Sequence, residues 1–328
     1  MKVAATAARI EACDVEEYAA LVRPWDVRLN QLSSGDYHNV LQGVSTPGMV
    51  IYEERWSRST EARGASPEGY VMFGTNVTWQ GTQVEWCGGV LDDSLIACAP
   101  PGADVDFKTP DRNQHVVVLV QPGLLAQAVG QTRVDELLHR RHVVTAGSDG
   151  RRLIGTIRGV VREYSGRPGL LGDAFAVRST ESRLLSTLSR CISGGSEDGG
   201  SDGIPAQRRL VRRAIELADS RTARVTALEL AVAVGVSQRT LETAFRQVLG
   251  TTPGSYLRLH RLNSAHRDLA HADPATATVT RIAQSWGFHH PSRFSAAHRR
   301  HFGETPSQTL SRPLLRSDTC PLGALVPV

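Results

Sequence analysis

The residues of this sequence with the clearest chemistry form two short arrays of polar side chains whose spacing suits contact with nucleic acid. In the first array, Arg239, Glu242 and Thr243 share one face of a predicted helix, because residues three and four apart are neighbours there. Arginine can pair with a guanine edge, glutamate can accept from a cytosine amino group, and threonine can bond to several bases. We therefore predict base contacts by these three residues, a phosphate contact by Arg246 and a further contact by Gln238.

The second array lies further along the chain and consists of His290, Ser292, Arg293, Ala296 and Arg299. Serine and arginine can hydrogen-bond to phosphate oxygens, which position a protein on DNA. Ala296 has no hydrogen-bonding side chain, although its methyl group could touch a thymine methyl. We therefore expect the first array to choose the DNA sequence and the second mainly to hold phosphates.

Two helices around a tight turn would position the first array. Thr226 and Glu229 form a capping-box pair that predicts the start of the first helix. Gly235 allows the turn, because a bulky residue at positive φ would be strained, and Ser237 caps the second helix. The inward stripe of that helix consists of Leu241, Ala244, Phe245 and Val248. A helix, a turn and a second helix in this order form the unit that places a helix in a DNA major groove.

The same arrangement recurs around the second array. Ile282 and Ala283 belong to its first helix, Gly287 allows the turn, and Pro291 suits the first position of the next helix. The inward stripe consists of Phe294, Ala297, His298 and Phe302. Between the two units, Pro253 to Ala270 reads as one helix, which would span roughly 27 Å at about 1.5 Å per residue. That length is close to one DNA turn of about 34 Å, so the two units could enter successive major-groove segments.

With these motifs in place, residues 207–310 resemble the DNA-binding domain of AraC/XylS-type transcription regulators. The matching stretches are LELAVAVGVSQRTLETAFRQVLGTTPGSYLRLHRLNSA and VTRIAQSWGFHHPSRFSAAHRRHFGETPSQ. The resemblance implies two helix-turn-helix units joined by a linker helix, which bind an asymmetric promoter site and contact RNA polymerase. Many members carry an arginine where this chain has Ala296 and an aromatic residue where it has His298. We expect weaker base discrimination by the second unit, and a packed His298 at the edge of the core.

The distribution of charge agrees with a nucleic-acid partner for the last third of the chain. The whole chain has a formal charge of only +4. Residues 204–316 hold 17 arginines and 7 acidic residues, or +10, whereas residues 1–203 hold 20 basic and 25 acidic residues, or −5. A basic segment of this kind attracts phosphate, so the partner of residues 204–316 is predicted to be double-stranded promoter DNA.

The upstream part of the sequence reads as a β-rich domain followed by helices. Short β-rich runs alternate with turn signals over residues 48–120, which is typical of an antiparallel sandwich or small barrel. Helical periodicity follows, with short helices at 123–129 and 133–141 and longer ones at 151–164 and 174–192. The longer helices have one apolar face each, which could pack on the sheet or on a second subunit as a homodimer. The predicted fold class is therefore α+β, with a β-rich sensor domain before an all-α DNA-binding domain.

Composition sets the expected domain boundaries. The segment GGSEDGGSDG, residues 194–203, has no apolar residue and is predicted to act as a flexible tether. We expect a ligand-sensing or dimerisation domain at 1–193, a linker at 194–206, the DNA-binding domain at 207–312 and a tail at 313–328.

Acids and tryptophans that lie close in sequence are candidates for an effector site in the upstream domain. A carboxylate beside aromatic faces can hold a cation, and Glu53, Glu54 and Glu85 lie near tryptophans in the sequence. The candidates chosen from this set are Glu53, Trp56, Trp79, Glu85 and Trp86. The alternative is that these residues are ordinary surface acids and buried tryptophans. Three stretches also resemble the sensor halves of family members that respond to small amines, which implies an amine effector: QLSSGDY near Gln31, the run Tyr52 to Trp56, and MFG with WQG at Met72 to Gly81.

Other chemistries find little support in the sequence. No phosphate loop, GxSxG or HExxH motif is present, so we expect no enzyme, no catalytic residue and no cofactor. The five cysteines share no metal or redox spacing, and the histidines at 289, 290, 298 and 301 lack a cysteine or carboxylate cluster, so we expect no metal site. The N-terminus does not read as a signal peptide and no long apolar window exists, so a cytoplasmic, bacterial protein without membrane contact is expected.

Two functions remain open from the sequence. The first is a ligand-responsive activator of a catabolic operon, and the second is a constitutive DNA-binding protein whose upstream domain only dimerises. The length of the upstream domain favours the first, because some 190 residues exceed what dimerisation requires.

Overall fold

The computed structural model describes residues 5–23, 25–77, 84–87, 89–91, 95–139, 142–145, 147–194, 197–198, 206–220 and 225–312. The chain forms two compact units. The first comprises Met1–Leu29, Tyr37–Asp202 and Arg316–Val328, and the second comprises Asn30–Asp36 and Gly203–Leu315. The predicted tether lies mostly outside the described residues, and the predicted tail lies wholly outside them.

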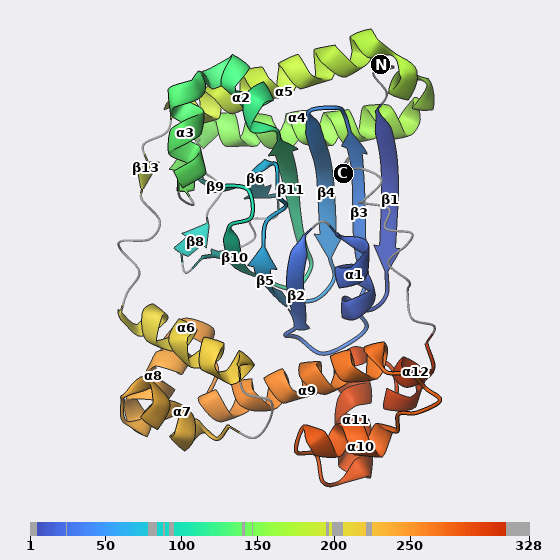
Figure 1. Ribbon diagram of the computed structural model, residues 1–328, viewed down its shortest axis with the longest axis vertical. Helices are drawn as coiled ribbons and strands as arrows, with labels where there is room; N and C mark the ends of the chain where they lie inside the picture. The colour runs from blue at the N-terminus through green and yellow to red at the C-terminus, as the bar shows by residue number, and fades with distance from the viewer. Residues whose placement is uncertain are drawn as a thin grey trace. The chain divides into compact units, whose positions relative to one another are not determined.

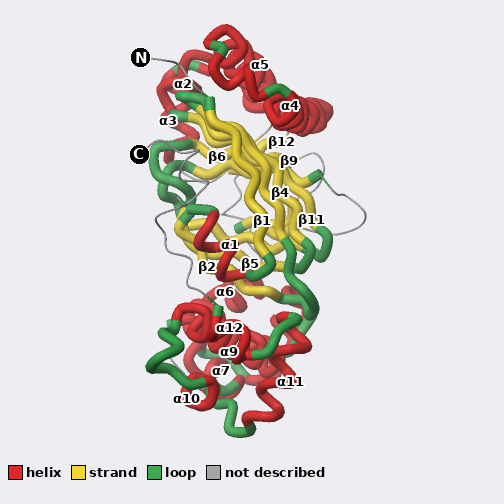
Figure 2. Tube along the Cα trace, turned by 90° about the vertical axis from the view of Figure 1, so that its right-hand side faces the viewer, coloured by secondary structure: helices red, strands yellow, loops and turns green. Residues whose placement is uncertain are grey.

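The first unit is built on two antiparallel sheets (Figures 1 and 2). The larger sheet has the strand order β1 (Thr6–Ala12), β3 (Asn39–Ser45), β4 (Met49–Trp56), β11 (Asn113–Val120), β6 (Val71–Asn76), β9 (Leu95–Ala99), β12 (His142–Thr145) and β13 (Glu197–Asp198). The smaller sheet has the order β2 (Asp26–Gln31), β5 (Thr60–Ala65), β10 (Asp104–Thr109), β7 (Val84–Trp86) and β8 (Gly89–Leu91).

The period-two alternation of the central strand β4 divides its side chains between two cores. Tyr52 and Trp56 belong to the core between the two sheets, whereas Met49 and Ile51 belong to the core on the other face of the larger sheet. Successive side chains of a strand point to opposite faces, so this division is set by position alone.

Helices cover the other face of the larger sheet. α4 (Gly147–Gly166) and α5 (Ala174–Gly194) lie side by side in Figures 1 and 2, joined by the short helix η1 (Pro168–Gly172). Leu153, Ile157, Leu184 and Leu188 of these helices are buried against strand residues such as Val118. From the sequence, the apolar faces of these two helices could pack on the sheet or on a second subunit. In the structure they pack on the sheet of their own chain. The unit also contains α1 (Val15–Leu21), α2 (Pro122–Val129) and α3 (Gln131–His139).

The described residues of the second unit from 206 onward form helices. Its helices are α6 (Ala206–Asp219), α7 (Ala227–Val234), α8 (Gln238–Leu249), α9 (Pro253–His271), α10 (Val279–Ser285), α11 (Pro291–Phe302) and α12 (Pro306–Ser311). The long helix α9 joins two separate cores: its Tyr256 and Leu257 pack with α6, α7 and α8, and its Leu262 and Leu269 pack with α10, α11 and α12. The predicted α+β fold class is confirmed.

The local signals of the first helix-turn-helix unit operate as the sequence predicts. The Thr226 side chain accepts from the Glu229 amide, and the Glu229 carboxylate accepts from the Thr226 amide, which completes the capping box. Gly235 ends α7 in the left-handed conformation with φ of 77°, and the Ser237 side chain caps α8. These caps fix where α8 begins and therefore which of its residues face outward.

Within the described residues, no helix combines the length and the apolar character that crossing a bilayer requires.

Candidate nucleic-acid interface and effector cavity

The outer face of α8 presents the first polar array. Gln238, Arg239, Thr243 and Arg246 are exposed and Glu242 is half-buried, while Leu241, Ala244 and Phe245 of the same helix are buried. The Thr243 hydroxyl donates to the Arg239 carbonyl over 2.9 Å, so its oxygen remains able to accept from a base amino group. The Gln238 amide donates to the Glu242 carboxylate over 3.2 Å, which holds that acid on the same face.

The outer face of α11 presents the second array. His290, Ser292, Arg293, Ala296 and Arg299 are all exposed. Pro291 occupies the first turn of the helix, and the last turn carries Arg299 and Arg300. The face thus offers arginines at both ends and a methyl group at its centre, a composition that suits phosphate contact better than base reading.

His298 points away from this face and into the core. It is fully buried between the rings of Phe294 and Phe302. Its Nε2 lies 3.1 Å from Nδ1 of His266, and its Nδ1 lies 3.0 Å from the Glu304 carbonyl oxygen. A packed histidine was the expectation from the sequence, and two hydrogen-bond partners satisfy both ring nitrogens without DNA.

The first unit contains a cavity of about 80 Å³ between its two sheets. Its walls are mainly aromatic and aliphatic, and the lining includes Tyr18, Trp25, Tyr52, Glu54, Trp56, Met72, Asn76, Val84, Trp86, Leu91, Phe107, Asn113 and His115. For comparison, an apolar cavity of about 150 Å³ binds benzene. A ligand that fits without movement of the walls is therefore smaller than benzene.

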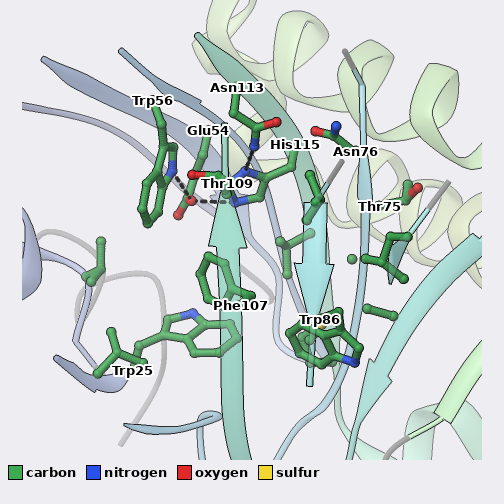
Figure 3. A pocket seen from close by; sticks show the side chains of 18 of the residues that line it. Trp25, Glu54, Trp56, Thr75, Asn76, Trp86, Phe107, Thr109, Asn113 and His115 are labelled. Carbon is green, nitrogen blue, oxygen red and sulfur yellow. Dashed lines mark hydrogen bonds and ion pairs between the residues drawn. The ribbon is translucent and has the colours of Figure 1, made fainter. Parts of the chain in front are cut away.

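One end of this cavity is polar. In the view of Figure 3, Glu54, Trp56, His115 and Asn113 gather at one end, and Trp25, Phe107 and Trp86 lie towards the other. The Glu54 carboxylate accepts from the Trp56 indole over 2.8 Å and pairs with Nε2 of His115 over 2.6 Å. Strand pairing explains the meeting, because β4 and β11 place Glu54 directly opposite His115.

The carboxylate of Glu54 is charged although it is buried. Burial by itself would raise its pKa, but the charge of His115 and the hydrogen bonds from His115 and Trp56 outweigh burial and lower the pKa below its ordinary value. The phenols of Tyr18 and Tyr52 have pKa values well above the ordinary one, chiefly through burial and then through the charge of Glu54, so they are neutral. Among the described lining residues none is a lysine or arginine.

The structure separates the five effector residues predicted from sequence. Trp56 and Trp86 line the cavity. Glu53 is not among the residues that line it, because it occupies the other face of β4, where it pairs with Arg55 at 2.9 Å and Arg158 at 3.3 Å. Glu85 also turns away and lies 3.9 Å from Lys108, and Trp79 lies outside the described residues.

Sequence reasoning named Glu54 beside Glu53 and Glu85 but did not choose it, and it missed His115, Trp25 and Phe107. A signal for Glu54 was present, because residues two apart on a strand share a face and Glu54 is two residues from Trp56. His115 carried no such signal, since only the pairing of β4 with β11 brings it to the carboxylate.

Comparison with known proteins gives relatives for the second unit. Residues 230–312 match a family model described as a helix-turn-helix domain. The chain is 41% identical over 107 residues to the probable thc operon regulatory protein of Rhodococcus erythropolis, and the match covers 32% of this chain and 32% of that protein. It is 35% identical over 130 residues to XylDLEGF operon transcriptional activator 2 of Pseudomonas putida, covering 39% of this chain and 78% of that protein.

A solved structure is also similar. The crystal structure of a probable AraC family transcriptional regulator from Rhodopseudomonas palustris is 36% identical, with a TM-score of 0.29, and the match covers 32% of this chain and 96% of that chain. The chain thus spans less than half the length of the Rhodococcus relative and 78% of the Pseudomonas relative.

Proposed function

This chain belongs to the AraC/XylS family of transcriptional regulators, and we propose that it activates a catabolic operon when a small effector occupies the cavity of its first unit. In this proposal residues 207–312 bind promoter DNA and contact RNA polymerase, residues 1–193 sense the effector and can dimerise, and residues 194–206 link them. The chain acts by binding and carries no catalytic role. The observation that best supports DNA binding is the pair of exposed polar faces on α8 and α11. The buried side of each helix packs in a separate hydrophobic core.

The helix α9 supplies the spacing that the DNA half needs. It has 19 residues, which at about 1.5 Å per residue gives about 28 Å, near the length of one DNA turn. Its two ends belong to the two cores, so the spacing between the units is held by continuous helix rather than by a loop. In this proposal α8 reads bases through Arg239, Glu242 and Thr243, and α11 holds phosphates.

To test whether α8 contacts bases, a preferred binding site is first selected from random DNA duplexes with the full chain. Arg239→Ala should weaken binding to that site by about 1 to 3 kcal/mol and relax the preference at one base position. The matched control is Arg178→Ala, which removes an exposed arginine from α5 of the first unit. If Arg239→Ala keeps both the affinity and the base preference of the control, α8 does not read the site.

The effector that we propose is a small amine. An ammonium group can lie against the indole and phenyl faces of the cavity, and the ionised Glu54 supplies the opposite charge. A carboxylate ligand would find no lysine or arginine among the described lining residues. The small volume favours a short aliphatic body over an aromatic ring.

Thermal unfolding of the full chain tests whether the cavity senses a ligand. Short alkylammonium salts should raise the unfolding temperature of the wild type, and Trp56→Leu should reduce that rise because it removes a wall of the cavity. Loss of the rise in Trp56→Leu together with unchanged DNA affinity would separate sensing from DNA binding. If no small metabolite stabilises the wild type or changes its DNA affinity, the protein is a constitutive DNA binder.

A further inference from the structure

The polar end of the effector cavity contains a charge pair that can change its protonation. Glu54 on β4 and His115 on β11 are in contact at 2.6 Å, and their side chains are only 7% and 15% exposed. Among the described residues, the charge of Glu54 also acts on the phenols of Tyr18 on α1, Tyr37 and Tyr52 on β4, whose pKa values are all raised, first of all by burial. Among the described lining residues, His115 is therefore the side chain that can act as a cation beside Glu54.

A buried carboxylate requires a partner of opposite charge, because desolvation of an unpaired ion is costly. In the cavity without a ligand, a protonated His115 fulfils this requirement and the pair has no net charge. Asn113 fits the charged imidazole. Its amide lies 3.2 Å from Nδ1 of His115, and in the orientation drawn its buried Oδ1 has no hydrogen-bond partner within the described chain. A half-turn of the amide brings Oδ1 to accept from Nδ1–H.

We propose that His115 is the internal counter-cation of Glu54 and that an ammonium effector replaces it, so that binding releases one proton from His115 to the solvent. This inference rests on the proposed effector site. Before binding, the site holds the carboxylate and the imidazolium. After binding, it holds the carboxylate, the ammonium and a neutral imidazole, and the released proton passes to the buffer. The charge of the cavity is zero in both states, which is the condition that its low-dielectric walls impose.

The exchange proceeds in this direction because the two cations differ in basicity. An alkylammonium has an ordinary pKa near that of lysine, about 10.4, whereas imidazole lies at about 6.5. Two cations beside one carboxylate leave an uncompensated positive charge in the cavity, and the weaker base loses its proton. Asn113 follows the change, since its Nδ2 can donate to Nδ1 of the neutral ring in the orientation drawn, at 3.2 Å.

A dependence of affinity on pH follows. Where His115 is protonated in the free protein, each unit of rising pH should tighten ammonium binding up to about tenfold, because one proton is released per ligand bound. The gain should end once His115 is neutral before binding. Neutral ligands of the same shape should show no such dependence.

The experiment uses the full chain and three probes of equal size: propylammonium chloride, propan-1-ol and sodium propionate. Calorimetric titrations in phosphate and in a buffer of high ionisation enthalpy differ in heat by the protons that the buffer takes up, and this difference counts the protons released per ligand. Both titrations are done at about pH 6, below the ordinary histidine pKa of about 6.5. We expect about one proton for propylammonium at this pH, and fewer at about pH 8.5. Propan-1-ol and propionate should bind more weakly or not at all.

His115→Gln is the companion variant, because glutamine can still donate to Glu54 but cannot carry a proton. Propylammonium should bind this variant without proton release and with equal affinity at the two pH values. If the variant does not fold, the ring proton resonances of His115 in the wild type give the same answer, since they should move to the neutral position when propylammonium saturates the site.

The outcomes separate the two proposals. Propylammonium binding without proton release at about pH 6, or with the same release from His115→Gln, overturns the exchange at His115 but leaves the effector cavity in place. Binding of propan-1-ol or propionate in preference to propylammonium overturns the exchange and replaces the amine class. Failure of all three probes to bind overturns the exchange together with the proposed effector cavity.

Discussion

Replacement of Glu54 by glutamine should destabilise the first unit by an amount that grows as the pH falls. The variant keeps the shape of the side chain but removes the charge that accepts from Trp56 and pairs with His115. Both hydrogen bonds are made to the ionised carboxylate of Glu54, a residue that is only 5% exposed. Solvent therefore does not weaken their contribution to stability. Hydrogen bonds to charged groups contribute roughly 1.5 to 3 kcal/mol each, of which the glutamine oxygen retains part.

At about pH 7.5 the cost should be about 2 kcal/mol, the part of the two hydrogen bonds that glutamine does not retain, because His115 of the unfolded chain is then mostly neutral. At about pH 5.5, roughly one unit below its ordinary pKa, the unfolded histidine is protonated, whereas the folded variant has no carboxylate to pair with it. Holding the buried imidazole neutral then costs about a further 1.4 kcal/mol, which brings the total to about 3.4 kcal/mol.

Urea unfolding of the full chain at the two pH values measures these differences by tryptophan fluorescence, since four of the five tryptophans belong to the first unit. Glu53→Gln is the matched control, because Glu53 is the neighbouring acid on the other face of β4 and pairs with the partly exposed Arg55 and Arg158. Such pairs contribute about 1 kcal/mol or less, and neither partner titrates in this range. An equal loss for Glu54→Gln at both pH values, or a loss no larger than that of the control, would refute the proposed charge pair.

The wild type should also lose stability in acid through the same residue. The folded pKa of Glu54 is lowered from its ordinary value of 4.5. The charge of Glu54 therefore contributes its full stability above pH 4.5, and this contribution is lost as the pH falls through the lower pKa that Glu54 has in the folded chain. Glu54→Gln should have a flatter stability curve than the wild type below that pH.

Three further predictions concern the second unit. Arg246→Ala should weaken binding to all DNA sequences alike and reduce the slope of log affinity against log salt by about 0.9, as measured by anisotropy titrations at several salt concentrations. Ala296→Arg should strengthen binding and add a guanine preference worth about 1 to 3 kcal/mol, which repeated site selection would detect and an unchanged selected site would contradict. Gly235→Ala should lower the free energy of unfolding by about 1 to 2 kcal/mol because Gly235 has a φ of 77°, and not through a clash, since nothing lies within 4 Å of the added Cβ. The control Gly254→Ala, inside α9, should not destabilise the chain in thermal unfolding.

The helix-turn-helix units could be predicted from sequence because their signals are local. Thr226, Gly235 and Ser237 act within a few residues of their own positions, and the stripe of α8 repeats within two turns. The strands between residues 6 and 47 gave no comparable signal. The edge strand β1, for example, has most of its residues exposed or half-buried, which leaves no clear alternation to read.

The sequence by itself determined that this chain carries two helix-turn-helix units, where α8 begins, and which residues of α8 and α11 face outward, since caps and helical periodicity act over one or two turns. Only the tertiary structure decided which acid faces the effector cavity. Glu53 and Glu54 are adjacent in sequence, and strand alternation sends the first to Arg158 of α4 and the second to the cavity. His115 meets Glu54 through the register of β4 and β11, and a pairing between residues 61 apart in the sequence is fixed by the packing of the whole sheet.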